Sequence, residues 1–230
     1  MGPFSKNPLN DNTLFDFKNY PDNLYKKPGE VAPNRAAFGD FGSWINSYVQ
    51  KKYNRPLALV CSADLAGSTN IAGFSKGWEE IEDFGMYEPK INENGTLLPQ
   101  GITEFANAGL MTGISSVNFS KEPYSEFNGY ITACSTYGSF SYLKYGAYRL
   151  FSQLAQDSQL KVGKTIWVAG HSGPETAEDS RTHFGIYAPG VTQLFPDGHI
   201  INLHPWEHNE VAPSLAAALS TEVPLIAVHL

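Results

Sequence analysis

The stretch Lys164-Thr-Ile-Trp-Val-Ala169 is a short apolar run that is followed directly by Gly170 and His171. A run of this kind is typical of a strand that is covered on both faces of a sheet. Comparable runs are Pro56-Leu-Ala-Leu-Val-Cys61, Gly129-Tyr-Ile-Thr-Ala-Cys134, His199-Ile-Ile-Asn-Leu203 and Pro224-Leu-Ile-Ala-Val228. We therefore predict five short buried strands.

Segments with helical spacing of apolar residues separate these runs. We expect helices over residues 43–53, 102–117, 139–156 and 207–221. Strands that alternate with helices predict an α/β fold with a mostly parallel sheet and helices on both faces. Ligands of such sheets bind at the carboxyl ends of the strands. These ends carry the polar residues of Ser62-Ala-Asp64, Gly170-His171 and His204-Pro205.

Residues 1–35 are rich in Asn, Pro, Asp, Lys and Tyr and have no periodicity. We predict an extended N-terminal arm or linker, followed by one domain over residues 36–230. The aromatic residues of the arm indicate that it packs on another part of the protein or on a partner and is not free in solution.

Composition excludes several classes of protein. Hydrophobic residues make up 42% of the 230 residues and charged residues 17%, which is typical of a folded globular chain. The net charge of −7 provides no basic surface for nucleic acid, and no apolar run is long enough to cross a membrane. The first residues lack the apolar core of a secretory signal, so we expect a cytoplasmic protein with Cys61 and Cys134 reduced.

Glu104 is the only charged residue between Glu93 and Lys121. The predicted apolar stripe of its helix comprises Ile102, Phe105, Ala106, Gly109, Leu110, Gly113, Ile114 and Val117. Glycines in that stripe would let another element approach closely. A lone buried carboxyl group takes up a proton or finds a partner, as proton-transferring groups of active sites do. The alternative is structural, because the helix dipole favours glutamate in a first turn.

The loop from His171 to His183 begins where the buried strand ends and contains two histidines, three acids and one arginine. Histidine and carboxylate together supply proton transfer near neutral pH, and a solvated polar loop is the alternative. Ser172, Asp179 and His183 could form a hydrolase triad, but Gly170-His-Ser-Gly-Pro174 departs from the nucleophile-elbow pattern. A zinc site built from the two histidines and Asp179 lacks the usual helical spacing.

Three motifs follow one another in a specific order. They are Ser62-Ala-Asp-Leu-Ala-Gly-Ser-Thr-Asn70, Gly101-Ile-Thr-Glu-Phe-Ala106, and His171, Asp179 and His183 at the spacing His-x7-Asp-x3-His. Asn209-Glu-Val211 comes after them. The ordered set resembles the central, pyrimidine-binding domain of transketolases over about residues 57–230. The resemblance implies the thiamine-diphosphate-binding fold for the domain 36–230.

The resemblance also implies roles in binding thiamine diphosphate. The family glutamate that matches Glu104 hydrogen-bonds the N1′ nitrogen of the cofactor's aminopyrimidine and promotes the proton transfers that activate it. Asp64 matches an aspartate near the cofactor. Phe140, followed by Tyr142 and Tyr145, resembles the aromatics that stack on the aminopyrimidine. A place in the hydrophobic core is the alternative for each of these three rings.

On the substrate side, Ser68 matches a phosphate ligand of the family. His171, Asp179 and His183 match residues that hydrogen-bond sugar hydroxyls or phosphate, and the resemblance gives both histidines a catalytic role. His204 takes the place of a family arginine and could donate one hydrogen bond to the substrate.

A second family arginine falls near Phe41 and Gly42, so it is also missing, although Arg181 could compensate. Arginine is the residue suited to bidentate capture of phosphate. The glutamate's usual histidine neighbour is Phe105 here. These departures indicate a substrate other than a usual sugar phosphate.

The family's Gly-Asp-Gly … Asn motif, which holds Mg²⁺ and the diphosphate, does not occur in this sequence. We therefore expect a diphosphate-binding domain, of the same or a partner chain, to complete the site in a homodimer. The complete enzyme would transfer a two-carbon ketol unit between small carbonyl or sugar substrates, and the chain alone would be inactive. The alternatives are a keto-acid dehydrogenase component, a phosphoketolase, or a non-catalytic dimerisation module.

Overall fold

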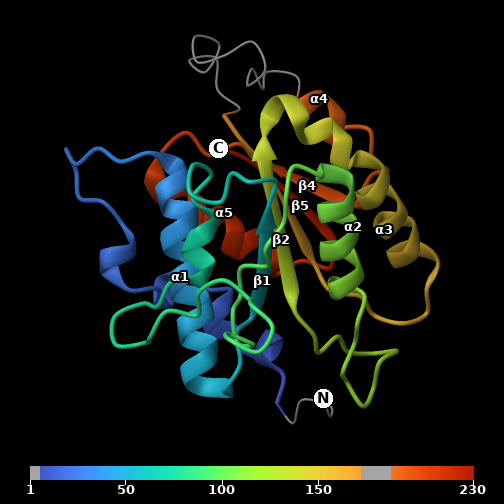
Figure 1. Cartoon of the computed structure of the whole chain (residues 1–230), viewed down its shortest axis with the longest axis horizontal. Coiled ribbons are helices and arrows are strands. Elements are labelled where there is room, and N and C mark those ends of the chain that lie inside the picture. Colours follow the sequence, from blue (N-terminus) through green and yellow to red (C-terminus); the bar gives the residue numbers. More distant parts are fainter. Residues whose placement is uncertain (1–5, 172–187) are drawn as a thin grey trace.

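The computed structural model describes residues 6–171 and 188–230 of the chain, and it contains one parallel sheet (Figure 1). The strand order is β1-β2-β3-β5-β4. The strands are β1 (Ala58–Ser62), β2 (Ile131–Tyr137), β3 (Thr165–Gly170), β4 (Ile200–Leu203) and β5 (Leu225–His229). Each of the five predicted apolar runs overlaps one of these strands, which confirms the predicted α/β class, although four of the strands extend one to three residues further.

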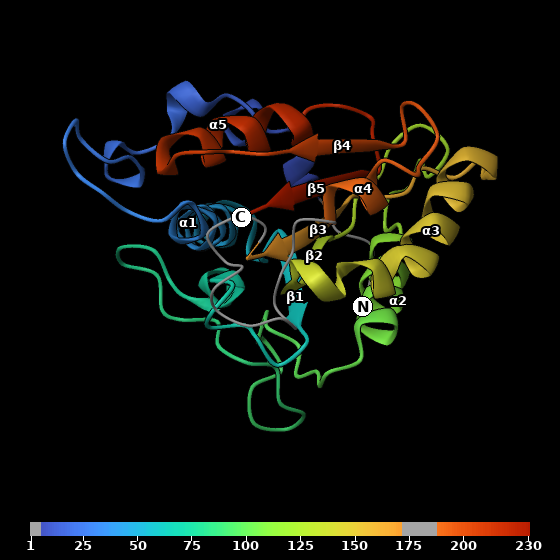
Figure 2. The ribbon, with the colours of Figure 1, turned by 90° about the horizontal axis from the view of Figure 1, so that it is seen from above.

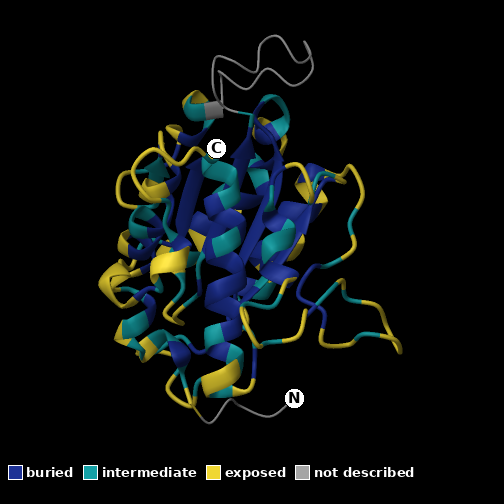
Figure 3. Cartoon of the chain, turned by 90° about the vertical axis from the view of Figure 1, so that its left-hand side faces the viewer, coloured by how far each residue is buried: buried dark blue, intermediate teal, exposed yellow. Residues whose placement is uncertain are grey.

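Helices cover both faces of the sheet, as Figure 2 shows from above. α1 (Asn34–Tyr53) and α5 (His208–Leu219) pack together on one face. α2 (Glu104–Ser115) and α3 (Tyr145–Asp157) pack together on the other, and the short α4 (Ala188–Thr192) precedes β4. All residues of β2, β3 and β5 are buried between these layers (Figure 3). Burial on both faces explains why β3 and β5 are largely apolar runs in the sequence, whereas β2 also buries Thr132, Ser135 and Thr136.

Helix α1 begins at Asn34, nine residues before the predicted start at residue 43. The missed part contains Gly39 and Gly42, which obscure the helical pattern. A Cβ atom added at Gly42 would lie 2.2 Å from the ring of Phe74 in the turn η5 (Ile71–Ser75). Glycine is therefore required by the close packing of η5 on α1, and that packing offsets the low helix propensity of the residue.

The N-terminal arm is a chain of single 3-10 turns, so the prediction of an extended arm is wrong in its local conformation. The turns are η1 (Pro8–Asn10), η2 (Asn12–Leu14), η3 (Phe17–Asn19) and η4 (Asp22–Leu24). Side chains of Asn7, Asp11 and Asp16 cap the first three of them. Short polar side chains bond nearby backbone N–H groups in this way and so favour turns. The predicted packing of the arm is confirmed, because Leu14, Tyr20 and Leu24 join the main core.

Helix α2 turns the opposite face to the sheet from the one predicted. Within the predicted stripe, Ile102 is 73% exposed and Phe105 58% exposed, and Gly109 and Gly113 have open space where a Cβ would lie. The buried face is instead formed by Glu104, Asn107, Ala108, Met111, Thr112 and Ser115. Hydrogen bonds satisfy its polar groups except one oxygen of Glu104: Ser115, for example, bonds both the Thr132 hydroxyl and the Lys164 carbonyl oxygen. Satisfied polar groups can be buried at little cost, so the helix exposes its apolar face.

All strands run in the same direction, so their carboxyl ends share one edge of the sheet. The connection from β3 to β4 skips one position, and β5 then returns to fill it. This reversal between β3 and β5 is the kind of place where parallel sheets bind ligands. No helix within residues 6–171 and 188–230 is long and apolar enough to span a membrane.

Asp11 anchors the arm to the last turns of α1. Substituting it therefore measures how much the attachment of the arm contributes to stability. Its Oδ2 accepts hydrogen bonds from Tyr48 Oη (2.9 Å), Lys52 Nζ (2.7 Å) and Tyr53 Oη (3.0 Å). Burial alone would raise the pKa of Asp11, but these bonds hold it well below its ordinary value of 3.8. A carboxyl group with a lowered pKa stabilises the fold above its unfolded-state pKa and loses that effect on protonation.

We expect Asp11→Asn to lower the free energy of unfolding at pH 7 by about 1–3 kcal/mol, the usual value for a hydrogen bond to a charged group. The difference from the wild type should shrink as the pH falls below about 4. Urea unfolding monitored by circular dichroism between pH 7 and pH 2.5 measures both effects. Asp16→Asn is the matched control, because Asp16 also caps a 3-10 turn but is exposed. An equal loss in both variants would contradict the role of Asp11 as an anchor.

Candidate functional site

Glu104 is the first residue of α2 and is 6% exposed. Its Oε1 accepts a hydrogen bond of 3.0 Å from the hydroxyl of Thr136, near the carboxyl end of β2. Oε2 has no hydrogen-bond donor within the part of the chain that the structure describes. The side chain occupies a first helical turn, as the structural alternative requires, and it is also buried near the carboxyl edge of the sheet, so the proton-transfer role stays a prediction.

Asp64 directly follows the end of β1, where its carboxylate is exposed. Its φ of +60° is in the left-handed region that non-glycine residues rarely adopt. A cavity of about 230 Å³ lies beside it, lined also by Met86 and Gln100. Ser68, in the loop after Asp64, is exposed and donates its hydroxyl only to the Leu65 carbonyl oxygen among the described residues.

A chain of buried hydroxyls holds the loop that carries Asp64 and Ser68. The Ser135 hydroxyl of β2 bonds those of Ser62 and Thr69, each at 2.8 Å. Thr69 also donates to the carbonyl oxygen of Leu65. The loop is thereby fixed against the carboxyl ends of β1 and β2.

His171 follows β3 and also has a positive φ, of +53°. The centre of its ring lies 4.2 Å from that of Tyr137, the last residue of β2. The Nη1 atom of Arg35 lies 3.4 Å from His171 Nε2. His171 is thus placed at the edge of the sheet by contacts from both β2 and α1.

Arg35 is a further candidate that the sequence analysis did not name, since it lies beside His171. It lies in the first turn of α1, where neighbouring Asn34 donates its side-chain amide to the Pro205 carbonyl oxygen at 3.0 Å. The sequence analysis placed the missing family arginine near Phe41 and Gly42. Phe41 is packed in the main core, and Gly42 is packed against η5. The signal that was available is that Arg35 is the only arginine in the first 54 residues.

Two histidines form a stacked pair at the ends of β4 and β5. The ring centres of His204 and His229 are 4.4 Å apart, and the ring planes differ by 4°. Burial lowers the pKa of His229 to about 3, and repulsion from His204 and Lys144 adds to this effect. Desolvation also lowers the pKa of His204. His229 Nε2 lies 3.4 Å from the Thr192 hydroxyl, whereas the ring of His204 is exposed at the edge.

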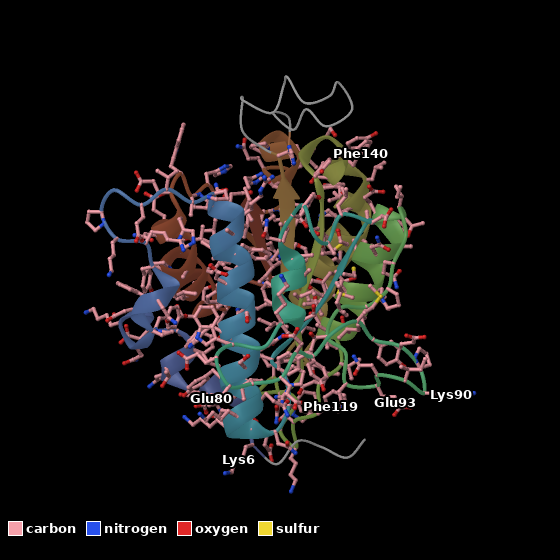
Figure 4. All side chains as sticks on the ribbon, turned by 60° about the vertical axis from the view of Figure 1, so that its left-hand side comes forward. Lys6, Glu80, Lys90, Glu93, Phe119 and Phe140 are labelled. Atoms are coloured by element: carbon pink, nitrogen blue, oxygen red, sulfur yellow. The ribbon has the colours of Figure 1, made fainter. Side chains whose placement is uncertain are left out.

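The three predicted aromatic residues have different environments. Phe140 and Tyr142 belong to the turn η6 (Gly138–Lys144), which replaces the first part of the predicted helix. Phe140 is half-buried and Tyr142 is 57% exposed. Figure 4 places Phe140 at the end of the molecule where the strands finish. Tyr145 packs edge-on against Phe195 at 5.2 Å, which agrees with the alternative that it is a core residue.

The structure therefore brings Asp64, Glu104, His171 and His204 to one edge of the sheet, with Arg35 added. Asp179 and His183 lie outside the described residues, as do Ser172 and Arg181. A larger cavity of about 580 Å³ lies at the other end of the strands, where Lys161 and Glu126 are among its lining residues. The carboxyl edge, and not this cavity, is the candidate site, because the predicted residues lie together at that edge.

His229 gives a pH-dependent test of this geometry. An imidazole that is neutral when folded but takes up a proton near pH 6.5 when unfolded destabilises the protein as the pH falls from about 6.5 to 3. His229→Gln removes this effect, so we expect its stability relative to the wild type to rise by up to about 1.4 kcal/mol per pH unit in that range. Urea unfolding between pH 7 and pH 4 measures the difference. A relative rise no larger than that of the control His199→Gln would contradict the burial of a neutral His229.

Comparison of the sequence with protein-family models and with curated proteins finds no match in either set. The similarity to transketolases therefore rests on the ordered motifs and their spacing.

Proposed function

We propose that this chain is the pyrimidine-binding domain of a transketolase-like, thiamine-diphosphate-dependent enzyme. The observation that carries the proposal is the position of Glu104, buried at the start of α2 with one oxygen held by Thr136 at the carboxyl edge. A carboxyl group held in a dry pocket with one oxygen free can exchange a proton with a ring nitrogen. The ordered motifs of the sequence support the same function.

The turn η6, which carries two of the predicted aromatic residues, packs on α2, the helix that begins at Glu104. Glu104 would hold a proton at the N1′ nitrogen, while Phe140 and Tyr142 offer aromatic faces for stacking. Asp64 would lie near the cofactor from the adjacent strand end. When bound, thiamine diphosphate supplies the nucleophilic carbon that carries a two-carbon unit. The diphosphate and Mg²⁺ would be held by a second domain, of the same or a partner chain.

Arg35, His171 and His204 support an anionic substrate at the other side of the edge. Arg35 supplies a permanent positive charge beside His171, and His204 lies at the end of the edge strand β4. Guanidinium and imidazole groups together bind phosphate or carboxylate. The sequence lacks two arginines that bind phosphate in the transketolase family. Arg35 would take the place of one of them, so this arrangement favours a substrate that carries phosphate.

The outer face of α2 supports a partner. We define this outer face as the exposed residues Ile102, Phe105, Leu110 and Val117 together with Gly109 and Gly113. Large apolar surfaces of this kind mark sites of association. We propose that a second copy of the chain covers it, so that the site is completed within a homodimer.

Glu104→Gln tests the proposed function in the enzyme completed with its diphosphate domain, thiamine diphosphate and Mg²⁺. Glutamine keeps the size of the side chain but cannot exchange a proton. We expect kcat for ketol transfer to fall by about 10²–10⁴, the usual contribution of a positioned acid or base. The 230-residue chain alone should have no activity.

Glu93→Gln is the matched control, because Glu93 is exposed and Figure 4 shows it far from Phe140. Ketol transfer that survives Glu104→Gln unchanged would refute the catalytic role. A completed protein that dimerises but has no transferase activity would favour the non-catalytic dimerisation module.

Phe105→Asp tests the proposed partner surface. A charge at the centre of an apolar interface is desolvated without a partner, so we expect the dissociation constant of the dimer to rise by at least about 10-fold. Sedimentation equilibrium of the purified chain measures it. Val31→Asp is the control, since Val31 is 98% exposed in the arm and lies outside this face. A wild-type chain that remains monomeric at about 100 µM, which corresponds to a binding free energy weaker than about −5.5 kcal/mol, or equal effects of both substitutions, would reject the surface.

A further inference from the structure

Lys144 is fully buried, although lysine is almost never found without solvent contact unless it is paired. It is the last residue of η6, and its side chain extends over the sheet beneath α2 and α3. Its Nζ donates to the carbonyl oxygens of Cys134 on β2 and Val168 on β3, both at 3.0 Å. The ammonium also lies 5.7 Å from the ring centre of Trp167. No carboxylate of the described residues forms an ion pair with it.

The position of this ammonium relative to Glu104 follows from β2. Cys134 and Thr136 are alternate residues of one strand, so both side chains point to the face that α2 covers. Thr136 binds the Glu104 carboxylate, and Lys144 binds the backbone at Cys134. The Trp167 ring beside the ammonium packs in one cluster with Ala108 of α2, so the ammonium and the Glu104 carboxylate lie on the same face of the sheet.

Titratable groups face Lys144 from every element around it. They are Glu104 of α2, Cys61 of β1, Cys134 of β2 and His229 of β5, and Tyr148 of α3 faces the two thiols. Burial lowers the pKa of Lys144 to about 8, and the two thiols and the Glu104 carboxylate oppose part of that shift. Glu104 is the only carboxyl group in this set, so it is the natural counter-charge of the buried ammonium.

We propose that Lys144 is a positioning residue for Glu104, fixing the end of β2 that carries Thr136 and placing a positive charge behind the carboxylate. Its two backbone bonds tie β2 to β3 just before the residues that form the site edge. The ammonium and the Glu104 carboxylate are both buried in the protein interior, where electrostatic interactions are screened less than in water. The importance of this for catalysis rests on the proposed function, whereas the coupling of the two charges does not.

Lys164 provides a matched comparison within the same chain. It is also a lysine with a pKa lowered to about 8 by burial. Its Nζ also donates to two backbone carbonyl oxygens, those of Thr221 and Val223. It lies before the start of β3, at the end of the sheet opposite the site.

The first experiment follows the side-chain resonances of ¹³C,¹⁵N-labelled lysine by NMR between pH 6 and pH 11 in the wild type and in Glu104→Gln. Lys144→Met and Lys164→Met identify the two resonances. An opposite charge favours the protonated form of a lysine, so we expect the Lys144 midpoint to move to lower pH in Glu104→Gln. The Lys164 midpoint should not move. An unchanged Lys144 midpoint, or an equal change at Lys164, would overturn the proposal.

The second experiment compares Lys144→Met with Lys164→Met in the completed enzyme, using kcat as a function of pH. A positioning role predicts that Lys144→Met changes the shape of the profile and lowers kcat at least 10-fold with little change in KM. Lys164→Met should lower neither. Parallel profiles for the two variants would overturn the role in catalysis. If the completed enzyme transfers no ketol unit, the proposed function fails, and the NMR result still decides whether the two charges are coupled.

Discussion

Strand β2 is buried along its whole length although several of its seven residues are polar, and the other parts of the structure are arranged to satisfy them. Thr132 donates to the Met111 carbonyl oxygen, Ser135 to Ser62, and Thr136 to Glu104. A buried polar group without a partner costs about 1–3 kcal/mol, so the bonds of Thr132 and Thr136 to α2 favour the orientation in which its polar side faces the sheet. Once the polar side faces inward, the apolar side must face outward, where a partner is expected.

The strands could be predicted from the sequence because a strand covered on both faces is rich in apolar residues, although the polar half of β2 was missed and β4, predicted as buried, is only partly buried. The same argument failed for α2, since its inner face is polar and its outer face apolar. Periodicity identifies a stripe but does not say what the stripe contacts. The start of α1 was missed for a different reason: Gly39 and Gly42 are required by contacts with η5, which lies about thirty residues later in the chain.

The candidate site shows the same division. Glu104, Asp64 and His171 could be predicted because each follows or faces a strand end, and strand ends in a parallel sheet meet at one edge. Arg35 could not, because the contact with His171 depends on the rotation of α1 and on where the helix begins. Lys144 could not either, since a lysine in an aromatic segment carries no sequence signal that it is buried. The sequence also could not distinguish a stacking aromatic residue from a core residue at Tyr145, whose ring packs against Phe195.

Asp64 and His171 both hold backbone conformations that glycine would adopt more easily. A left-handed conformation costs about 1–2 kcal/mol for a residue with a Cβ, although aspartate and histidine tolerate it better than most. The protein would therefore be more stable with glycine at these two positions, if backbone conformation alone mattered. Replacing Asp64 or His171 by glycine would relieve the backbone strain but would remove the carboxylate or the imidazole that the proposed site uses.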